Sequence, residues 1–223
     1  MTGVFPTLQP GSQHTIDLPG LAVTKIVVDE KTHNNCYLLR CTQTGTQALI
    51  DAADDAQRLL KLIGPKLVTS VITTHEHWDH HRALKKVVEE TGAVTVAGGP
   101  DAASITDQTS VDIDLEVSDD DVIAVGAAKL TVIRLTGHTP GSIALVYQPE
   151  GAPTRIFSGD ALFPGGVGNT FGDAQAFATL IDDVENKIFN RFSDDTVFHP
   201  GHGDDSTLGE QRPHLGEWRE RGW

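Results

Sequence analysis

The sequence predicts an α/β protein with two β-sheets whose outer faces are covered by helices, a four-layer arrangement. The main observation is that segments typical of strands are followed by segments typical of helices, and that this order occurs twice. In addition, the 223 residues contain no low-complexity segment, no solenoid repeat and no linker long enough to separate two domains. With 39% apolar and 22% charged residues, the composition predicts one globular domain over residues 1–223.

The first half of the chain is rich in predicted strands. Short runs of β-branched and aromatic residues, separated by turn residues such as TQTGT, predict strands at 21–29, 35–41, 47–52 and 66–74. Helices are expected at 54–63 and 79–91, the second ending at Gly92 as a helix C-terminus commonly does. The strand at 66–74 runs directly into a cluster of histidines.

The second half repeats this order. Strands are expected at 112–117, 122–135, 142–147 and 155–159. A long helix at 174–192 and a last strand at 196–200 follow. The remaining residues, 206–223, form a short tail in which Pro213 suits a first helical position and Leu215 and Trp218 share one turn, so we expect a helix docked on the domain.

Charge and composition exclude several classes of partner. The formal net charge of −14 would repel a phosphate backbone, so no nucleic-acid partner is expected. No stretch reaches the length of an apolar membrane span, and the N-terminus lacks a signal-peptide pattern, which predicts a cytoplasmic protein without a membrane partner. Cys36 and Cys41 lie within one predicted strand and are interpreted as reduced packing residues.

The stretch THEHWDHH, residues 74–81, is the strongest chemical signal. A thermolysin-type HExxH motif is excluded because position 79 is Asp. In an extended segment alternate residues point the same way, so His75 and His77 can reach one ion together. Asp79 falls at the start of the predicted helix, where an N-cap is the simplest role. On that helix His80 shares the apolar face and points inward, whereas His81 is expected to point mostly outward.

Three further candidate ligands each follow a strand and a glycine. They are His138 in TGHTPGS, Asp160 in SGDALF and His202 in PGHGD. Glycine permits close backbone approach at a strand end. One such site is commonly only a turn, but their combination with the cluster at 74–81 favours a metal centre.

This motif set resembles that of the metallo-β-lactamase superfamily, over roughly residues 20–205. The resemblance implies an αββα sandwich. It also implies two metal sites: one with His75, His77 and His138, the other with Asp79, His80 and His202, and Asp160 bridging both. Imidazole and carboxylate ligands suit Zn²⁺, which we expect first, and also Fe and Mn.

The resemblance further implies a hydrolytic mechanism. Two divalent ions would bring the pKa of a shared water from about 15.7 toward about 7, and the bridging hydroxide would attack an acyl carbonyl. Asp79 is the expected catalytic residue, because it would orient the hydroxide and move its proton while binding the second ion. No GxSxG nucleophile motif is present, and the sequence assigns no substrate-binding residue.

Among branches of the superfamily, the chain is most similar to glyoxalase II, the hydroxyacylglutathione hydrolase, which cleaves a thioester of a small molecule. Two alternatives stay open: a lactonase or other small-ester hydrolase, and a mono-iron persulfide dioxygenase that would use His75, His138 and Asp160. Only about twenty residues follow PGHG, too few for the helical glutathione-binding domain of long glyoxalase II proteins. The glycine-rich segment 163–172 lacks basic residues for a glutathione carboxylate.

Four other residues near these motifs are assigned simple roles. His199 is interpreted either as a hydrogen-bond partner of a ligand or as a packing residue at a strand end. Asp204 and Asp205 are expected in a solvated loop. Ser142 is interpreted as a turn residue.

Overall fold

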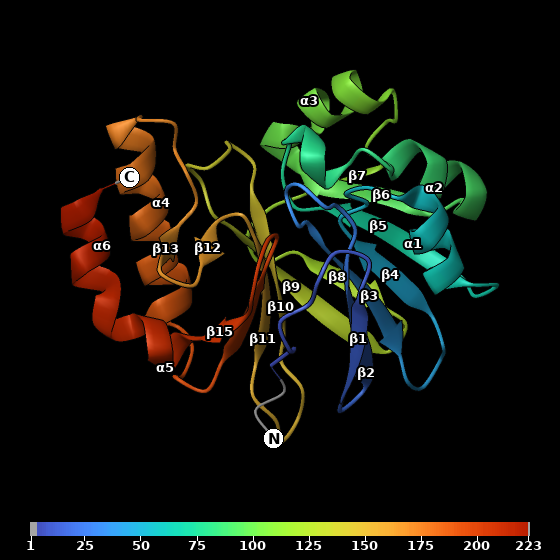
Figure 1. Ribbon diagram of the computed structural model, residues 1–223, viewed down its shortest axis with the longest axis horizontal. Coiled ribbons are helices and arrows are strands. Elements are labelled where there is room, and N and C mark those ends of the chain that lie inside the picture. The colour runs from blue at the N-terminus through green and yellow to red at the C-terminus, as the bar shows by residue number, and fades with distance from the viewer. Residues whose placement is uncertain (1–3, 223) are drawn as a thin grey trace.

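The computed structural model of the protein describes residues 4–222 as two facing β-sheets with helices on both outer faces (Figure 1). The predicted four-layer α/β arrangement is confirmed. Residues 1–3 and residue 223, the last of the predicted tail, lie outside the described residues. No helix within the described part of the chain has the length and hydrophobicity that a membrane span requires.

The first sheet contains seven strands in sequence order. They are β1 (Gln13–Leu18), β2 (Leu21–Val27), β3 (Asn35–Cys41), β4 (Gln47–Ile50), β5 (Val68–Thr73), β6 (Val94–Gly98) and β7 (Leu115–Val117). Neighbours from β1 to β4 are antiparallel, and those from β4 to β7 are parallel. The parallel part places the C-terminal ends of β4, β5 and β6 at one edge of the sheet, where the histidine cluster begins.

The second sheet contains six strands in the order β15, β14, β11, β10, β9, β8. Their bounds are β8 (Val122–Val125), β9 (Ala128–Arg134), β10 (Ile143–Tyr147), β11 (Arg155–Gly159), β14 (Val197–Pro200) and β15 (Ser206–Thr207). Only β11 and β14 pair in parallel. A separate two-stranded ribbon, β12 (Leu162–Phe163) and β13 (Gly166–Val167), follows β11.

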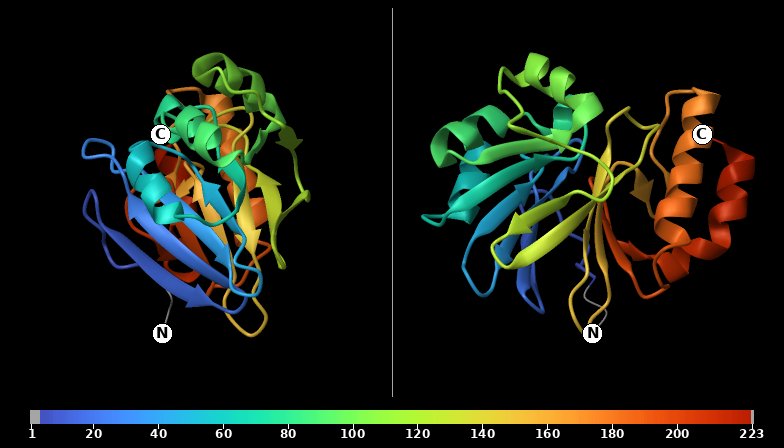
Figure 2. Two further views of the ribbon diagram at one scale, coloured as in Figure 1. Left: turned by 90° about the vertical axis from the view of Figure 1, so that its right-hand side faces the viewer. Right: turned by 180° about the vertical axis from the view of Figure 1, so that it is seen from behind.

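Helices cover the two outer faces separately (Figure 2). The first sheet carries α1 (Ala56–Ile63), α2 (Leu84–Thr91) and α3 (Gly99–Thr109). The second carries α4 (Ala174–Asp183), its π-helical continuation Val184–Phe189, α5 (Leu208–Gln211) and α6 (Leu215–Arg221). Two 3₁₀ turns, Trp78–His80 and Arg212–His214, complete the helical segments.

Three apolar cores hold these layers together. The central core lies between the sheets and includes Leu39, Ile72 and Phe157. The other two lie between each sheet and its helices, around Leu59 for the first sheet and Leu180 for the second. Each such side chain contributes about 1.5–3 kcal/mol when it is fully buried, so the strand ends that carry the functional residues rest on rigid elements.

Several predicted elements differ in detail. The strands β1 and β6 and the helix α3 were not predicted. The expected strand 122–135 is a hairpin that turns at Gly126, where φ is +60° and a Cβ would lie 2.1 Å from Thr44 Oγ1. The expected helix 79–91 begins only at Leu84, because residues 81–83 form a turn whose Ala83 N–H donates to Ala52 O. In the tail, Trp218 is buried against Phe189 with ring centroids 6.1 Å apart.

Candidate metal centre

All seven predicted ligands lie at strand ends along one edge of the two sheets. The first four follow β5 of the first sheet, and the other three follow β9, β11 and β14 of the second sheet. They are His75, His77, Asp79, His80, His138, Asp160 and His202. The centre is therefore built from both halves of the molecule.

The structure gathers these side chains into three groups whose donor atoms lie within 4.8 Å of one another. We name the group of His75, His77 and His138 site 1. The group of Asp79, His80 and His202 is site 2. Asp160 groups with one histidine of each site, His75 and His80. This geometry supports the predicted division into two ion sites that share Asp160, and the ligand assignment itself stays a prediction.

The donor atoms converge closely. In site 1, His75 Nε2 lies 3.1 Å from His77 Nδ1. In site 2, His80 Nε2 lies 3.1 Å from His202 Nε2. Asp160 reaches both sites, because its Oδ1 lies 3.5 Å from His80 Nε2 and its Oδ2 lies 3.8 Å from His138 Nε2.

The donor set fits divalent metal ions. His138 Nε2 and Asp160 Oδ1 are buried and have no hydrogen-bond partner among the described residues, although buried polar atoms in proteins are normally satisfied. The backbone of Gly201 packs directly against the centre, because a Cβ there would collide with Asp160 Oδ1 and with the His80 ring. Imidazole nitrogens with carboxylate oxygens form a set that Zn²⁺, Fe and Mn all accept.

Outer partners orient three of the histidine rings. The Nδ1 atom of His138 donates to Asn169 O at 2.7 Å, and that of His202 donates to Thr32 O at 2.7 Å. The third, His80 Nδ1, lies 2.8 Å from Asp51 Oδ2. Each contact directs Nε2 of the ring into the centre, as is usual for metal-binding histidines.

Two residues whose side chains hydrogen-bond predicted ligands, Asp51 and Asn34, were not predicted from the sequence. Asp51, at the end of β4, is buried and also accepts from Thr74 N at 2.8 Å and Thr74 Oγ1 at 2.9 Å. Asn34 donates through Nδ2 to Asp79 Oδ2 at 3.1 Å. Both residues stand at the end of a strand or in a loop with no motif around them, so the sequence carries no signal for their role.

Burial keeps the histidines of site 1 neutral. Burial lowers the pKa of His75 well below its usual value, and the neighbouring His80 lowers it further. Burial also lowers the pKa of His77 and His138. Neutral imidazole is the form that binds a metal ion, so the three histidines of site 1 are in their metal-binding form.

Carboxylates dominate the electrostatics of site 2. Burial lowers the pKa of His80 and His202, but neighbouring carboxylates together outweigh it. Asp160 and Asp51 raise the pKa of His80 well above its usual value, and Asp160 and Asp79 raise that of His202 to about 9. Conversely, burial opposes the ionisation of Asp79 and Asp160, but their histidine neighbours hold both pKa values below the usual range. Both aspartates are therefore carboxylates at neutral pH.

Two expectations about neighbouring residues were wrong. His81 is 2% exposed rather than outward, and its Nε2 lies 3.0 Å from Glu76 O. The expectation assumed that a helix begins at Asp79, whereas residues 78–80 form a 3₁₀ turn with a different set of faces.

Asp205 is also buried rather than solvated. It pairs with Lys25 Nζ at 3.0 Å and lies 2.9 Å from His199 Nδ1, and all three side chains are at most 1% exposed. His199 thus contacts Asp205 and stacks on Phe157 with ring centroids 5.1 Å apart, and none of its contacts among the described residues is with a predicted ligand, so its interpretation as a packing residue at a strand end fits better. A sequence signal was available: Lys25 interrupts an apolar run in β2, and a buried charge requires a partner.

The glycine-rich segment lies beside the centre. Phe171 is 70% exposed, and its ring centroid lies 5.6 Å from that of His77 and 6.1 Å from that of His138. Phe163 lies 6.4 Å from the His202 ring. Two phenylalanines from residues 162–171 therefore flank the two sites, one each.

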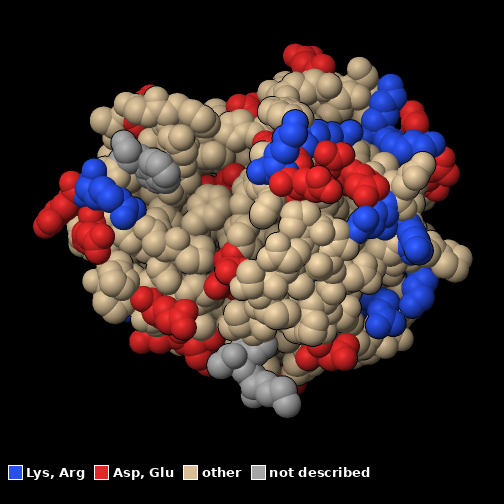
Figure 3. Space-filling model, in the orientation of Figure 1, with Lys and Arg blue, Asp and Glu red and all other residues tan. Residues whose placement is uncertain are grey.

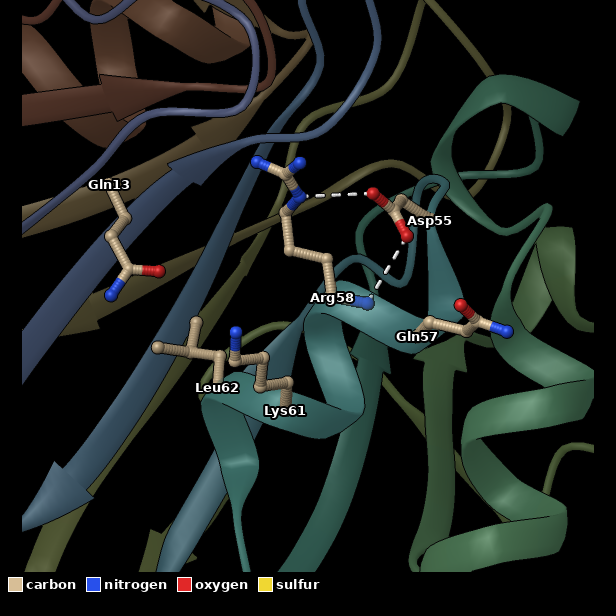
Figure 4. A pocket seen from close by; sticks show the side chains of 6 residues that line it. All are labelled: Gln13, Asp55, Gln57, Arg58, Lys61 and Leu62. Carbon is tan, nitrogen blue, oxygen red and sulfur yellow. Dashed lines mark hydrogen bonds and ion pairs between the residues drawn. The ribbon is translucent and has the colours of Figure 1, made fainter.

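The pocket beside α1 and the charged surface regions contain none of the predicted ligands. A pocket of about 700 Å³ between β1 and α1 is lined by Gln13, Asp55, Gln57, Arg58, Lys61 and Leu62 (Figure 4). Its arginine is already engaged, because Arg58 Nε pairs with Asp55 Oδ2 at 3.0 Å. Figure 3 shows most Lys and Arg of one face on its right-hand part, with Asp and Glu among them, and further Asp and Glu along its lower and left parts.

Comparisons with known proteins show the family of the chain. A family model described as the metallo-beta-lactamase superfamily matches residues 30–208. The hydroxyacylglutathione hydrolase of a Polaromonas species is 33% identical over 187 residues, which cover 82% of this chain and 66% of that protein. A probable hydroxyacylglutathione hydrolase, glo2, of Schizosaccharomyces pombe is 29% identical over 188 residues, which cover 81% and 68%. The chain thus spans about two thirds of the length of these relatives.

Solved structures show the same fold. The crystal structure of ETHE1 from Myxococcus xanthus has a TM-score of 0.75 and 25% identity, covering 89% of this chain and 84% of that one. A structure of TTHA1623 in a di-iron-bound form has a TM-score of 0.65 and 26% identity, covering 84% and 96%. The similarity extends over most of both chains in each case.

Proposed function

This chain is a metal-dependent hydrolase of the metallo-β-lactamase superfamily, and we propose that it cleaves a small thioester at a centre of two divalent ions. The observation that carries the proposal is the arrangement of two triads of donors around one shared carboxylate, Asp160. The named relatives that are hydroxyacylglutathione hydrolases support a thioester as the substrate class. We propose Zn²⁺ as the first candidate for both ions, with Fe or Mn compatible with the same donors.

The two groups of donor atoms support a position for each ion. Site 1 would hold one ion through three imidazoles, and site 2 would hold the other through Asp79 and two imidazoles, with Asp160 between them. When bound, two such ions supply Lewis-acid chemistry: they lower the pKa of a water toward about 7 and polarise a substrate carbonyl.

Asp79 is the group proposed to handle the proton. Its carboxylate is only partly exposed, and Asn34 Nδ2 holds Oδ2 at 3.1 Å. Because its pKa is depressed, Asp79 is an ionised acceptor at neutral pH and can hold the attacking water in one orientation. In the reaction the C–S bond of the thioester breaks, a C–O bond forms from water, and the products are a carboxylic acid and a thiol.

Phe171 and Phe163 are proposed to contact the substrate. Phe171 projects from the chain beside site 1 and Phe163 lies beside site 2. Phe171 is exposed and Phe163 is half-buried, and large apolar groups accessible beside a polar centre are typical of ligand contacts. Residues 163–172 include no Lys or Arg, so the contact favours an apolar part of the substrate.

The test is a hydrolysis assay on protein reconstituted with Zn²⁺, Fe²⁺ or Mn²⁺. S-lactoylglutathione, a set of simpler thioesters, lactones and oxygen esters are compared, and free thiol or acid is measured. We expect thioesters to show the highest kcat/KM and Asp79→Ala to abolish most of the turnover. Faster turnover of lactones or oxygen esters would instead assign the alternative esterase function, and no turnover of any ester would refute the proposal.

A mono-iron persulfide dioxygenase is the second candidate. It is retained because His75, His138 and Asp160 also converge, with His138 Nε2 3.8 Å from Asp160 Oδ2. That function predicts oxygen uptake with a glutathione persulfide in the iron-loaded protein, which a thioester hydrolase does not show.

A further inference from the structure

The proposed reaction does not use Asp101, although this carboxylate is completely buried in the first turn of α3. It accepts three hydrogen bonds. Its Oδ2 accepts from Glu76 N at 3.0 Å and from Thr139 Oγ1 at 2.6 Å, and its Oδ1 accepts from Gly141 N at 2.6 Å. Burial raises the pKa of Asp101, and the contacts with Thr139 and Gly141 oppose this effect. Such a group is costly to bury unless its contacts are retained.

These three contacts tie together the two segments that carry site 1. Glu76 lies between the ligands His75 and His77 at the end of β5, and Thr139 directly follows the ligand His138 after β9. One carboxylate therefore connects the positions of all three site-1 ligands, which come from different sheets. None of its hydrogen bonds reaches a residue of site 2.

Two side chains of helix α3 hydrogen-bond the two backbone polar groups of Glu76. Asp101 accepts from its N–H, and Gln108, further along the same helix, donates through Nε2 to its carbonyl at 3.0 Å. The second segment can approach the helix this closely only because residue 141 is glycine: a Cβ there would lie 2.5 Å from the backbone nitrogen of Asp101. The close contact therefore depends on one residue from each segment, Asp101 on the helix and Gly141 on the loop.

We propose that Asp101 is a positioning residue that sets the metal affinity of site 1 without setting that of site 2. This inference rests on the proposed two-ion function. Partners that fix the orientation of metal ligands commonly change metal affinity about 10- to 100-fold when they are replaced. Without the carboxylate, the ion would have to order both segments itself, and that ordering reduces its net affinity.

The experiment compares Asp101→Asn in two backgrounds that each retain one site. His202→Ala leaves site 1, and His138→Ala leaves site 2. Asparagine keeps the shape of the side chain but replaces one acceptor oxygen by a donor group, which then faces an N–H. Zn²⁺ affinity is measured by competition with a chromophoric chelator. We expect an approximately 10- to 100-fold loss in the His202→Ala background and no loss in the His138→Ala background.

Asp114→Asn is the matched control. Asp114 also accepts from a threonine N–H and hydroxyl, those of Thr95 at 2.9 and 3.0 Å, but contacts neither ligand segment. It should leave the affinity unchanged in both backgrounds. Thr139→Val removes one of the three hydrogen bonds while Asp101 remains. It should lower the Zn²⁺ affinity of site 1 alone, by a smaller factor. If Asp101→Asn does not fold, this variant decides the question.

Two results would overturn the inference. Equal losses in both backgrounds would mean that Asp101 only stabilises the fold, and unchanged affinity in both would mean that it has no role in metal binding. In either case wild-type protein that binds two ions and cleaves thioesters would leave the proposed function intact. Wild-type protein that binds no Zn²⁺, Fe²⁺ or Mn²⁺ would refute the proposed function and this inference together.

Discussion

Asp79 is the single residue on which the proposed chemistry depends most. Its carboxylate is ionised and held by Asn34, and general acid–base groups in enzymes typically contribute about 10²- to 10⁴-fold to the rate. We predict that Asp79→Asn lowers kcat by that factor in a thioester assay, with the metal content of each preparation measured in parallel. Asp204→Asn, at an aspartate in the loop after His202, is the control and should retain full activity. A kcat for Asp79→Asn within threefold of wild type would refute the proposed role.

A second prediction at the scale of single residues concerns the proposed contact of Phe171 with the substrate. Phe171 is 70% exposed, and its ring lies beside two site-1 histidines. An aromatic contact is worth about 0.5–1.5 kcal/mol, so Phe171→Ala should lower kcat/KM about 2- to 10-fold, mainly through KM. Leu67→Ala removes another exposed apolar side chain that is not beside the ligands and should change neither constant. An unchanged KM in Phe171→Ala would remove Phe171 from the substrate contact.

The residues of the centre differ in how far the sequence reveals them. His75, His77, Asp79 and His80 are adjacent in a motif, and His138, Asp160 and His202 each follow a strand and a glycine, so pattern and position are enough to propose them. Asp51, Asn34 and Asp101 act through contacts between distant segments. No spacing in the sequence records such contacts, and only the fold brings the partners together.

At the scale of elements, strand β2 contains a buried charge. All seven of its residues are buried, including Lys25, whose charge is balanced by Asp205 from the loop after β14. Lys25 Nζ also donates to Gly203 O at 2.8 Å, next to the ligand His202. The pair therefore supports the segment that carries one ligand of site 2, and breaking it should cost about 3–5 kcal/mol of stability because the remaining charge is left buried.

The pH dependence of this pair follows from the pKa of Asp205. Burial raises that pKa, but His199 and Lys25 outweigh burial and hold it at about 2, below the unfolded value of about 3.9. A depressed folded pKa gives stability that is fully present above about pH 4 and is lost as pH falls toward 2. We predict that the difference in unfolding free energy between wild type and Asp205→Asn, measured in urea on metal-free protein, is constant above pH 4 and shrinks below it. A difference that stays constant down to pH 2 would contradict this account.

The elements that the sequence missed have a physical explanation. Strand β6 is short and is followed at once by Gly99 and Pro100, which resemble a loop, although Pro100 in fact occupies the first turn of α3. The helix expected from Asp79 is delayed to Leu84 because His80 and His81 turn inward to Asp51 and to Glu76 O. In both places tertiary contacts outweigh the local pattern.

At the scale of the whole molecule, each site joins the two sheets. Site 1 takes His75 and His77 from the first sheet and His138 from the second, and site 2 likewise takes His202 from the second. Bound ions should therefore crosslink the halves. An ion present at 100 times its Kd stabilises a fold by about 2.7 kcal/mol.

We predict that chelation lowers the melting temperature of reconstituted protein, followed by circular dichroism. The ions hold together segments from both sheets, so their removal should destabilise the whole fold. Returning Zn²⁺ should restore the melting temperature. The His138→Ala and His202→Ala variants, each with one site left, should show smaller shifts than wild type. Chelator shifts that are equal in all three proteins would contradict the crosslinking account.

The central claim is that two ions share this centre, and a count of metal ions per chain tests it most directly. Native mass spectrometry of the Zn²⁺-reconstituted protein should give two ions per chain in wild type, one in His138→Ala and one in His202→Ala. One ion or none in wild type, with Zn²⁺, Fe²⁺ and Mn²⁺ each supplied in excess, would contradict the claim.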